Sequence, residues 1–529
     1  MSLKQEISNI LCEHLACAEV VLEIPKDATL GDLATPIAFS LAKEYKKSPM
    51  QIAEDLAVKL ESLDCFESVV ATKGFINFRI SEALTNRYMD EILEQGFTKK
   101  ASKNQKILLE FVSANPTGPL HIGHARGAIV GEALHSIGSF LGYEIDKEYY
   151  INDAGNQMDL LATSLIICYE QNILKQDVTL PEDYYRGEYL DEIAQEFYDL
   201  FGKEIFELGS KSKLASLAKD KVIELINEDL ALIGVYFDTF VSEKSMYEKS
   251  EATFVLLEKN KALYENEGKT WIASTTHKDE KDRVVIKEDK TPTYLAGDII
   301  YHNDKFERGY DQYINIWGAD HHGYINRVKS SIEFLGYDSA KLEIILSQMV
   351  ALLKDKTPYK MSKRKGNFIT LKEVAEEIGS EPLKLIFLSK KCDTHLEFDV
   401  TSLSKKDASN PIYYIQYAHT RICSLLRKST TSEASYKASS FTSENTTLKK
   451  LIIQSLLLED VLENAFSHRE INRLIDYLHQ LASEVHSFYN QNQIIDSPNE
   501  KLYLKTLSLV ATTIQTALGL IGIEAKESM

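Results

Sequence analysis

Hydrophobic residues recur at helical spacing in the first hundred positions of the chain and then alternate in one short run. Apolar residues three and four positions apart predict helices, and alternation of apolar and polar residues predicts a strand. The expected helices cover 3–18, 35–45 and 49–63, and the expected strand covers 74–80. The polar run 99–104 is typical of a linker. We therefore expect a small α+β domain over residues 1–104.

Beyond residue 105, short apolar runs alternate with longer helical ones. The runs expected to be strands are 107–112, 148–151, 284–286, 313–317 and 343–346. This alternation is typical of an α/β fold with a doubly wound, mainly parallel sheet. Residues 160–234 combine helical periodicity with many charges and predict a helical insertion. A Rossmann-type nucleotide-binding domain is expected over 105–400.

Strand signals fade in the last part of the chain. Residues 401–529 carry helical periodicity only and predict an all-α bundle. The stretch 428–447 is rich in Ser and Thr, so we expect it to interrupt the bundle as a mobile loop. With 529 residues, the chain is long enough for three such domains.

Composition narrows the class of protein. Apolar residues make up 44% of the chain and charged residues 26%, as in a globular enzyme. No run of about 18 apolar residues is present, so we expect no membrane partner. The six cysteines are scattered without a Cys-x-x-Cys pair. That pattern favours reduced thiols in the cytoplasm and argues against structural zinc.

The chain is acidic, with a formal net charge of −19 at pH 7. This charge does not exclude RNA as a partner, because a local basic surface can bind phosphates while the remaining surface stays acidic. Any such binding is expected to be localised and sensitive to salt.

A segment with glycine and proline, 113–124, lies between an apolar run and a helical pattern. It reads Ser-Ala-Asn-Pro-Thr-Gly-Pro-Leu-His-Ile-Gly-His. Its prolines, Pro116 and Pro119, exclude a helix over residues 113–119. Backbone N–H groups at the start of the following helix would attract phosphate. His121 and His124 can both face that point and donate to a phosphoryl oxygen. Gly127 and Gly131, one turn apart, would let the helix approach the sheet closely.

A second segment, 360–367, reads Lys-Met-Ser-Lys-Arg-Lys-Gly-Asn. Its ammonium groups suit a departing pyrophosphate, and its glycine suits a moving loop. Taken alone, the first segment is also typical of two capping histidines, and the second of a solvated basic surface. Together they predict a site for a nucleoside triphosphate. A pair of histidines without a third ligand does not predict a metal site.

The two segments resemble the HIGH and KMSKS signatures of class I aminoacyl-tRNA synthetases. His121-Ile-Gly-His124 matches completely, and Lys360-Met-Ser-Lys-Arg364 differs only at Arg364. The wider context resembles arginyl-tRNA synthetases in particular. The similar runs are 31–35, 74–78, 113–127, 150–157, 317–323, 395–399 and 414–419. Many bacterial members lack the central lysine of the second signature, whereas Lys363 is present here.

The resemblance implies a pocket for arginine. Glu243 and Asp298 would offer carboxylates to the guanidinium group, with Tyr294 one helical turn before Asp298. Ser113 and Asn115 would hold the α-ammonium and α-carboxylate end of the amino acid. Such a polar pocket rejects analogues that leave its buried acceptors unpaired, so selection needs no proofreading domain. Without the motif context, the two acids would be interpreted as surface charge.

The resemblance also implies a reaction in two steps. Arginine and ATP, with Mg²⁺ on the phosphates, would give arginyl-adenylate and pyrophosphate, and the terminal adenosine of the tRNA would then accept the arginine. His121 and His124 would stabilise the phosphorane, and Lys360 and Lys363 the departing pyrophosphate. The other residues expected to bind ATP are Pro119, Gly123, Gly318, Asp320, His321, Met361 and Ser362. No tightly bound cofactor is expected.

The C-terminal bundle is similar to the anticodon-binding domain of this family. Proteins read single-stranded RNA by stacking on its bases and by hydrogen bonds to base edges. The candidate contacts are Tyr414, Tyr417, His419, Arg421 and Met529, with Asn77 as a candidate contact for the tRNA elbow. The expected partners are the tRNA for arginine, ATP and L-arginine. A monomer in the cytoplasm is expected.

Two other hypotheses stay open from the sequence. The first is a different class I synthetase, although a cysteine enzyme would need metal ligands that are missing, and a glutamate or glutamine enzyme would lack the N-terminal domain. The second is a non-catalytic tRNA-binding relative. The presence of His121, His124 and Lys363 argues against it.

Overall fold

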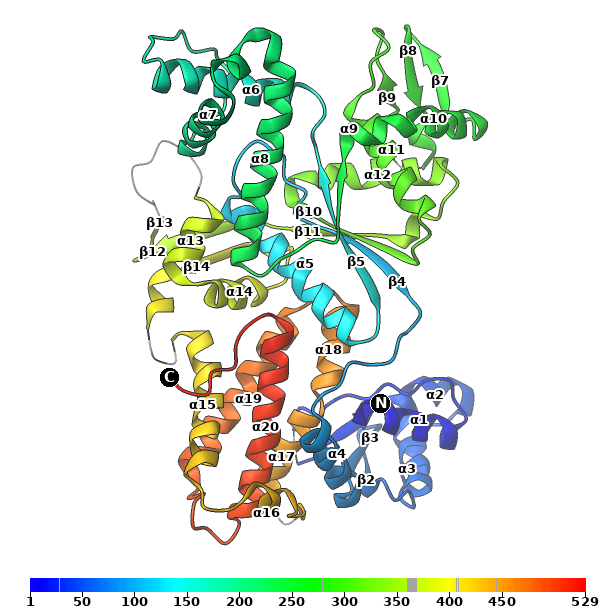
Figure 1. Cartoon of the computed structure of the whole chain (residues 1–529). Coiled ribbons are helices and arrows are strands. Elements are labelled where there is room, and N and C mark those ends of the chain that lie inside the picture. The colour runs from blue at the N-terminus through cyan, green and yellow to red at the C-terminus, as the bar shows by residue number, and fades with distance from the viewer. Residues whose placement is uncertain (28, 278, 359–368, 406, 408, 444) are drawn as a thin grey trace. The chain divides into compact units, whose positions relative to one another are not determined.

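The computed structural model describes all residues except 28, 278, 359–368, 406, 408 and 444. The chain forms two compact units, whose elements are labelled in Figure 1. One unit comprises residues 100–404, and the other comprises residues 1–99 together with 405–529. The middle of the chain thus makes one unit, and the two ends of the chain share the other.

A five-stranded parallel sheet forms the centre of the unit 100–404. Its strands lie in the order β11-β10-β4-β5-β6, and every neighbouring pair is parallel. They are β4 (Lys106–Glu110), β5 (Glu144–Ile151), β6 (Thr239–Ser242), β10 (Gln312–Gly318) and β11 (Leu342–Ser347). This order confirms the predicted doubly wound sheet. The chain order reverses between β4 and β10, the kind of position where open α/β sheets bind ligands.

One predicted strand belongs to a different sheet. Residues 284–286 do form a strand, but it lies in a separate antiparallel sheet. That sheet contains β7 (Leu263–Asn266), β8 (Lys269–Ile272) and β9 (Arg283–Ile286). The assignment of 284–286 to the parallel sheet was wrong because a short apolar run does not reveal its partner. The parallel sheet instead contains β6, which the prediction missed because only Val241 of its four residues is buried.

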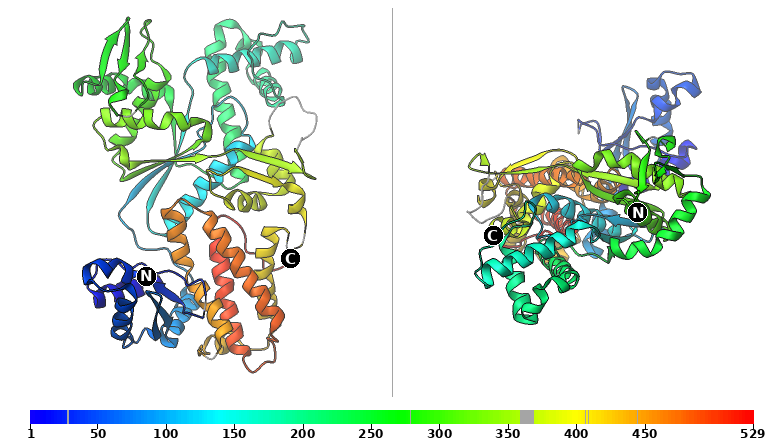
Figure 2. Two further views of the ribbon diagram at one scale, coloured as in Figure 1. Left: turned by 180° about the vertical axis from the view of Figure 1, so that it is seen from behind. Right: turned by 90° about the horizontal axis from the view of Figure 1, so that it is seen from above.

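Helices pack on both faces of the parallel sheet, as Figures 1 and 2 show. Leu108 of β4 packs against residues of α11 and α12 on one face, and α5 lies on the other. The helices of this unit are α5 (Ile122–Phe140), α6 (Asn156–Cys168), α7 (Glu188–Phe201), α8 (Lys211–Leu232), α9 (Glu243–Met246), α10 (Ser250–Lys259), α11 (Tyr294–Glu307), α12 (Ile325–Phe334), α13 (Leu371–Ile378) and α14 (Ser380–Leu388). A small sheet contains β12 (Val350–Lys354), β13 (Thr357–Pro358) and β14 (Leu396–Asp399). Helices α6, α7 and α8 fall between β5 and β6, where the helical insertion is expected.

The two glycines of α5 differ in how closely the sheet approaches them. A Cβ atom added to Gly131 would lie 2.5 Å from ring carbons of Phe111, the residue after β4. A Cβ added to Gly127 would meet its nearest neighbour, a methyl group of Ile316, at 3.7 Å. Gly131 is therefore the residue that lets the helix lie against the sheet.

This difference gives a stability prediction. Gly131→Ala is expected to lower the free energy of unfolding by about 1 to 3 kcal/mol, because the methyl group overpacks the Phe111 ring. Gly127→Ala is expected to be neutral or to stabilise by up to about 1 kcal/mol through helix propensity. Urea unfolding of each variant, compared with the wild type, measures the change in the free energy of unfolding. Equal effects from the two variants would contradict the packing argument.

The second unit combines a small α+β fold with a helical bundle. Its N-terminal part has an antiparallel sheet in the order β1-β3-β2. The elements there are α1 (Leu3–Leu15), β1 (Leu33–Thr35), α2 (Ile37–Tyr45), α3 (Pro49–Leu60), β2 (Phe66–Thr72), β3 (Phe75–Ile80) and α4 (Glu82–Gln95). The bundle contains α15 (Pro411–Lys428), α16 (Glu433–Lys437), α17 (Thr446–Leu456), α18 (Leu458–Ser467), α19 (Asn472–Gln491) and α20 (Glu500–Leu520).

The stretch 428–447, expected to interrupt the bundle as a mobile loop, is instead partly helical and packed. The stretch contains the short helix α16, and Phe441 within it is only 1% exposed. The backbone N–H of Phe441 donates to the side chain of Asn86 at 2.7 Å, and the Asn86 amide donates back to the Phe441 carbonyl at 3.0 Å. A Ser/Thr-rich composition concealed these few apolar anchors, which hold the segment against α4.

Two buried lysines join the two ends of the chain within this unit. Lys449 of α17 is 4% exposed, and its ammonium lies 3.2 Å from Asp32 and 2.9 Å from Glu67. Lys505 of α20 is 2% exposed and lies 2.6 Å from Asp90 of α4. Buried charges of this kind are tolerated only when paired. The N-terminal part and the bundle therefore depend on each other for these partners.

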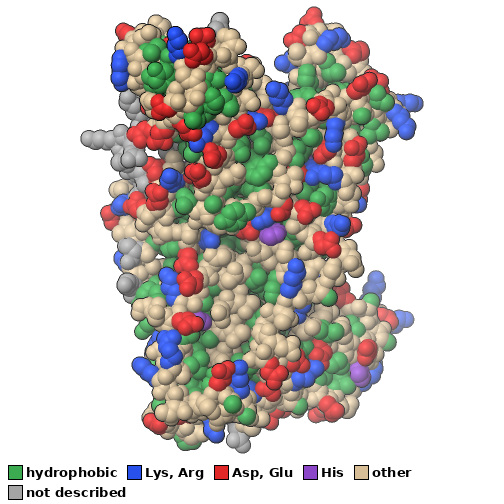
Figure 3. All heavy atoms as spheres, viewed as in Figure 1, with side chains coloured by type: hydrophobic (Ala, Val, Ile, Leu, Met, Phe, Trp, Pro, Cys, Tyr) green, Lys and Arg blue, Asp and Glu red, His purple; other side chains and the backbone are tan. Residues whose placement is uncertain are grey.

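The visible surface carries both signs of charge. In Figure 3, Lys and Arg side chains are interspersed with Asp and Glu over the whole face. Among the described residues, no helix is both long enough and apolar enough to cross a membrane.

Candidate active site at the carboxyl edge of the parallel sheet

The carboxyl ends of the parallel strands carry most of the predicted site residues. Strand β4 leads into the loop 111–120 and then into α5, and β6 leads directly into α9 with Glu243 as its first residue. Strand β10 ends at Gly318. Because parallel strands end at one edge, these segments converge there even though they are far apart in the sequence.

His121 is the N-cap of α5. Its Nδ1 accepts the backbone N–H of Gly123 at 3.1 Å, and the backbone N–H of His121 donates to Nδ1 of His124 at 3.4 Å. The two rings stack with centroids 3.7 Å apart. A Cβ on Gly123 would approach the His121 ring to 2.8 Å, so glycine leaves room for this imidazole. The sequence pair thus forms a compact capping arrangement at the positive end of a 19-residue helix.

Both imidazoles are neutral under ordinary conditions. Burial lowers the pKa of His121, and burial together with the neighbouring ring lowers the pKa of His124 to about 3. Since Nδ1 of each ring accepts a backbone N–H, the ring proton of the neutral form belongs on Nε2. In each neutral ring, Nε2 is therefore the nitrogen that can donate a hydrogen bond.

Residues 369–371 lie beside this helix start. The N–H of Ile122 donates to the carbonyl of Ile369 at 3.0 Å, and the N–H of Leu371 donates to the carbonyl of Leu120 at 2.7 Å. These residues follow closely on the second signature segment in the sequence. The predicted residues of that segment, Lys360, Met361, Ser362 and Lys363, lie outside the described residues.

The other predicted ATP residues lie at strand and loop ends. Pro119 and Gly123 flank His121 and are partly buried. Gly318 ends β10, and a Cβ there would lie 2.5 Å from Oδ1 of Asp320, so the carboxylate folds back over the glycine. Asp320 and His321 are exposed, with Oδ2 and Nε2 3.8 Å apart. Their exposure leaves both side chains accessible to a ligand.

Glu243 and Asp298 lie close together, and this pair of acids with the side chains around it is called the acidic pocket below. Glu243 is 3% exposed, and one of its oxygens accepts the hydroxyl of Tyr247 at 3.1 Å, while Oε2 has no hydrogen-bond partner. A Cβ added to Gly297, the residue before Asp298, would lie 2.7 Å from Glu243 Oε1. Tyr294 lies one turn earlier on α11 and is 59% exposed, at the rim.

The acids of this pocket repel each other. Burial, the charge of Glu243 and the charge of Glu110 raise the pKa of Asp298 to about 7. Burial and the charge of Asp153 raise the pKa of Glu243, although the hydrogen bond from Tyr247 opposes this. Among the described residues, no cationic nitrogen lies within ion-pair distance of either acid. The pocket therefore favours a cation that can donate several hydrogen bonds.

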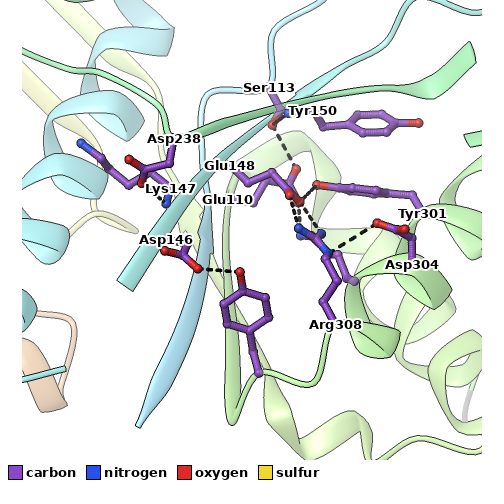
Figure 4. A network of polar contacts seen from close by, with 12 residues as sticks. Glu110, Ser113, Asp146, Lys147, Glu148, Tyr150, Asp238, Tyr301, Asp304 and Arg308 are labelled. Atoms are coloured by element: carbon purple, nitrogen blue, oxygen red, sulfur yellow. Dashed lines mark hydrogen bonds and ion pairs between the residues drawn. The ribbon is translucent and has the colours of Figure 1, made fainter. Parts of the chain in front are cut away.

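Ser113 sits in a strained turn after β4. Val112 and Ser113 have positive φ angles of 67° and 41°, a conformation that side chains other than glycine rarely adopt. The Ser113 hydroxyl donates to Glu110 Oε1 at 3.0 Å and accepts the N–H of Tyr150 at 3.1 Å (Figure 4). The turn therefore holds Ser113 next to Tyr150, which lies beside the acidic pocket. Asn115, the other residue predicted for the amino-acid end, is exposed in the following loop.

Below Ser113, a buried ionic network fixes the carboxylates of β4 and β5. Lys305 of α11 pairs with Glu110 and donates to Asn315 at 2.9 Å. Although burial alone would raise it, the charge of Lys305 keeps the pKa of Glu110 below its ordinary value. Arg308 pairs with Glu148 of β5 through bonds of 2.6 and 3.0 Å (Figure 4).

Sequence reasoning did not identify this network. A signal was available: Glu110 directly follows the apolar run 107–109 and Glu148 directly precedes the residues 149–151, and an acid beside such a run requires a partner if it is buried. Lys305 and Arg308 lie three residues apart at the end of one helix, the spacing that presents both to the sheet.

Arg126 was also missed by the sequence analysis. It is fully buried, and its guanidinium donates to the carbonyls of Gln348, Lys391 and Thr394 at 3.3, 2.7 and 2.6 Å.

In the bundle, several predicted RNA contacts form one aromatic group. Tyr417 is 37% exposed, and the guanidinium of Arg421 lies 5.5 Å from its ring centre and 3.8 Å from that of Tyr489. Tyr414 stacks on His479 at 5.0 Å. Together these rings, on α15 and α19, form a face that suits stacked bases.

The remaining predicted RNA contacts are less accessible, with one exception. His419 is 3% exposed, and its Nδ1 lies 3.0 Å from the carbonyl of Lys526. Asn77 is also 3% exposed and donates to the carbonyl of Val70 at 3.2 Å. Met529 is 52% exposed. The RNA contacts of all three stay predictions.

Among the described residues, no three His, Cys, Asp or Glu side chains gather as metal ligands would.

Comparison with known proteins gives consistent results along the whole chain. Residues 1–80 match the model of the arginyl tRNA synthetase N terminal domain, residues 88–418 that of the class I (R) tRNA synthetase catalytic domain, and residues 415–529 that of the DALR anticodon binding domain. The chain is 53% identical to the arginine–tRNA ligase of Nitratiruptor sp., over 97% of this chain and 98% of that protein.

Solved structures show the same likeness. A crystal structure from Campylobacter jejuni is 49% identical and superposes with a TM-score of 0.82, covering 85% of this chain and 100% of that one. The Thermus thermophilus arginyl-tRNA synthetase superposes with a TM-score of 0.77 over 100% of both chains at 19% identity, which shows a shared fold.

Proposed function

Because the chain belongs to the arginyl-tRNA synthetase family, we propose that its parallel-sheet edge carries out both steps of arginine–tRNA ligation. In the first step, the carboxylate of arginine attacks the α-phosphorus of ATP, and pyrophosphate leaves. In the second, the terminal adenosine of the tRNA attacks the activated carbonyl. The alternative of a non-catalytic relative is not favoured, because His121 and His124 are present at an intact helix start.

The observation that carries the proposal is the unpaired acidic pocket. Glu243 and Asp298 are forced together without a cationic partner among the described residues, and a guanidinium group supplies charge and planar donors at once. Tyr247 and Tyr294 border the pocket. The Ser113 hydroxyl donates to Glu110 and accepts from the N–H of Tyr150. Its second lone pair is proposed to accept a hydrogen bond from the ammonium group of the substrate. Asn115 is proposed to hold the carboxylate end.

ATP is proposed to bind where α5 begins. The helix dipole and the Nε2–H groups of His121 and His124 would stabilise charge on the α-phosphate as it develops. Lys360 and Lys363 are assigned to the pyrophosphate from the sequence signature. Residues proposed for the nucleotide itself are Pro119, Gly123, Gly318, Asp320, His321, Met361 and Ser362. Mg²⁺ would arrive with ATP as part of the substrate.

The tRNA is proposed to meet the aromatic face of α15 and α19. Arg421 and Tyr417 offer a cation and an exposed ring to anticodon bases, with Tyr414 beside them. His419, Met529 and Asn77 are proposed as further RNA contacts on the basis of resemblance to the family. We place the reaction in the cytoplasm and expect a monomer to carry it out.

A pH dependence follows from the acidic pocket. Asp298 has a raised pKa of about 7, so below that pH its carboxyl is protonated and must lose the proton to pair with guanidinium. Arginine affinity should therefore fall about fivefold between pH 7 and 6, and approach a tenfold fall per pH unit only further below the pKa. The charges of Glu243 and Glu110 also raise the pKa of Asp298, and the charge of Arg327 lowers it. Titration calorimetry in buffers of different ionisation enthalpy measures the released proton. A flat affinity, with no proton release, would contradict this.

The direct test of the function is aminoacylation. Purified protein with ATP, Mg²⁺ and total tRNA is incubated with each labelled amino acid in turn. Arginine alone should be transferred to tRNA, at a rate well above a reaction without enzyme. Transfer of another amino acid would favour a different class I specificity, and transfer of none would reject the function.

A further inference from the structure

The helical insertion contacts the backbone of the loop that precedes His121. Tyr189, at the start of α7, donates its hydroxyl to the carbonyl of Thr117 at 2.6 Å. The same hydroxyl would lie 3.1 Å from a Cβ atom on Gly118. Any side chain larger than hydrogen at position 118 would press on Tyr189. The tyrosine is partly buried, and it fits this part of the loop closely.

Asp229 of α8 holds the next part of the loop. It is 4% exposed, and its Oδ2 accepts the N–H of Leu120 at 3.0 Å. The carbonyl of Leu120 accepts the N–H of Leu371. The residue immediately before the capping histidine is therefore held from both sides, by the insertion and by the segment that closely follows the second signature.

Asp229 has an environment that stability alone does not favour. Burial raises its pKa to about 6, and the bond from Leu120 and the charge of Lys372 oppose this only in part. Among the described residues, no cationic nitrogen lies within 4 Å of its carboxylate. A buried acid that serves one backbone N–H costs stability, and a neutral acceptor would cost less. The presence of a carboxylate at this place indicates that the position of Leu120 has to be fixed.

We propose that Asp229 and Tyr189 are positioning residues for adenylate formation, through which the helical insertion sets the backbone from Thr117 to His121. This inference rests on the proposed ATP site at the start of α5. Neither side chain needs to touch ATP. They act by fixing where α5 begins, and hence where the imidazole Nε2 donors lie relative to the α-phosphate.

Helix α8 also reaches the arginine side of the site. Lys219 lies 3.4 Å from Asp153, and Asp153 accepts the Ser242 hydroxyl and the N–H of Lys244, the residues on either side of Glu243. Lys219 and Asp229 are ten residues apart on one helix, a separation of about 15 Å. One rigid helix therefore contacts the loop of the ATP site and the base of the acidic pocket. Figure 1 shows α8 running toward α5.

The test compares two substitutions of the same residue. Asp229→Ala removes the acceptor, whereas Asp229→Asn retains an oxygen in the same place. In arginine-dependent ATP–pyrophosphate exchange with tRNA present, Asp229→Ala should lower kcat by about a hundredfold. Asp229→Asn should remain within about threefold of the wild type, and the KM for arginine should stay within about twofold for both. Tyr189→Phe, which keeps the ring and removes only the hydroxyl, should lower kcat by about tenfold. This variant tests the proposal if Asp229→Ala does not fold.

The control is Glu224→Ala, an exposed acid on the same helix, which should leave exchange unchanged. An unaffected kcat in Asp229→Ala or in Tyr189→Phe would overturn the inference. Equal losses in Asp229→Ala and Asp229→Asn, with matching losses of melting temperature, would show a role in stability only and overturn it as well. No exchange in the wild type would remove the proposed function and this inference together, whereas an active wild type with unaffected variants removes the inference alone.

Discussion

Asp298→Asn is expected to lower kcat/KM for arginine by about a thousandfold. The change leaves Glu243 to pair alone and turns an amide NH₂ toward guanidinium donors, and the loss of one partner of a buried ion pair costs about 4 kcal/mol. Glu243→Gln is expected to have a similar effect. Steady-state exchange over a range of arginine concentrations measures both variants.

The same substitution should not destabilise the free protein. The pKa of Asp298 is raised, so above about pH 7 the folded state holds a carboxylate that it disfavours, and asparagine removes that cost. The melting temperature at pH 8 should therefore be equal to or higher than that of the wild type. Glu307→Gln, an exposed acid on the same helix, is the matched control. Normal arginine kinetics in Asp298→Asn would show that the pocket does not recognise the guanidinium group of arginine.

His124→Ala is expected to lower kcat for pyrophosphate exchange by about a hundredfold or more, because it removes a donor aimed at the developing charge. The geometry refines this expectation. Nδ1 accepts from the backbone of His121, and Nε2 carries the donor. Glutamine places an amide near Nε2, whereas asparagine places one near Nδ1. His124→Gln should therefore retain more activity than His124→Asn.

The control for this series lies three turns along the same helix. His135 is paired with Glu132 at 3.3 Å, away from the helix start, and His135→Ala should leave exchange within about twofold of the wild type. Because the pKa of His124 is about 3, its ring stays neutral from pH 6 to 9 and should add no inflection to the rate over that range. Near-normal exchange by His124→Ala would remove this residue from the mechanism.

The sequence was sufficient for elements whose signals are local. The prolines before Leu120 and the apolar spacing after it marked the end of the loop and the start of α5. Gly127 and Gly131 predicted a close approach of helix and sheet, which the structure shows at Gly131 only, against Phe111 just after β4. The acids of the pocket were found through resemblance, since nothing in the spacing of Glu243 and Asp298 alone joins them.

What the sequence did not reveal depends on contacts between distant residues. Asp229 looks like any acid on a charged helix until Leu120 is seen beside it, and β9 looks like a core strand until its antiparallel partner is known. Asn86 and Phe441, more than 350 residues apart, converted an apparent loop into packed structure. Surface and interior were also hard to separate within one motif: Tyr417 is exposed, whereas His419, two positions later, is buried.

The shared unit at the two ends of the chain affects synthesis on the ribosome. Asp32 and Glu67 emerge early, but their ammonium partner on α17 follows only after roughly 300 intervening residues of the other unit. At about 5 to 20 residues per second, the nascent N-terminal part waits between about 15 and 60 seconds for it. During that interval the carboxylates stay hydrated, and the surface that later faces the bundle is open to chaperones.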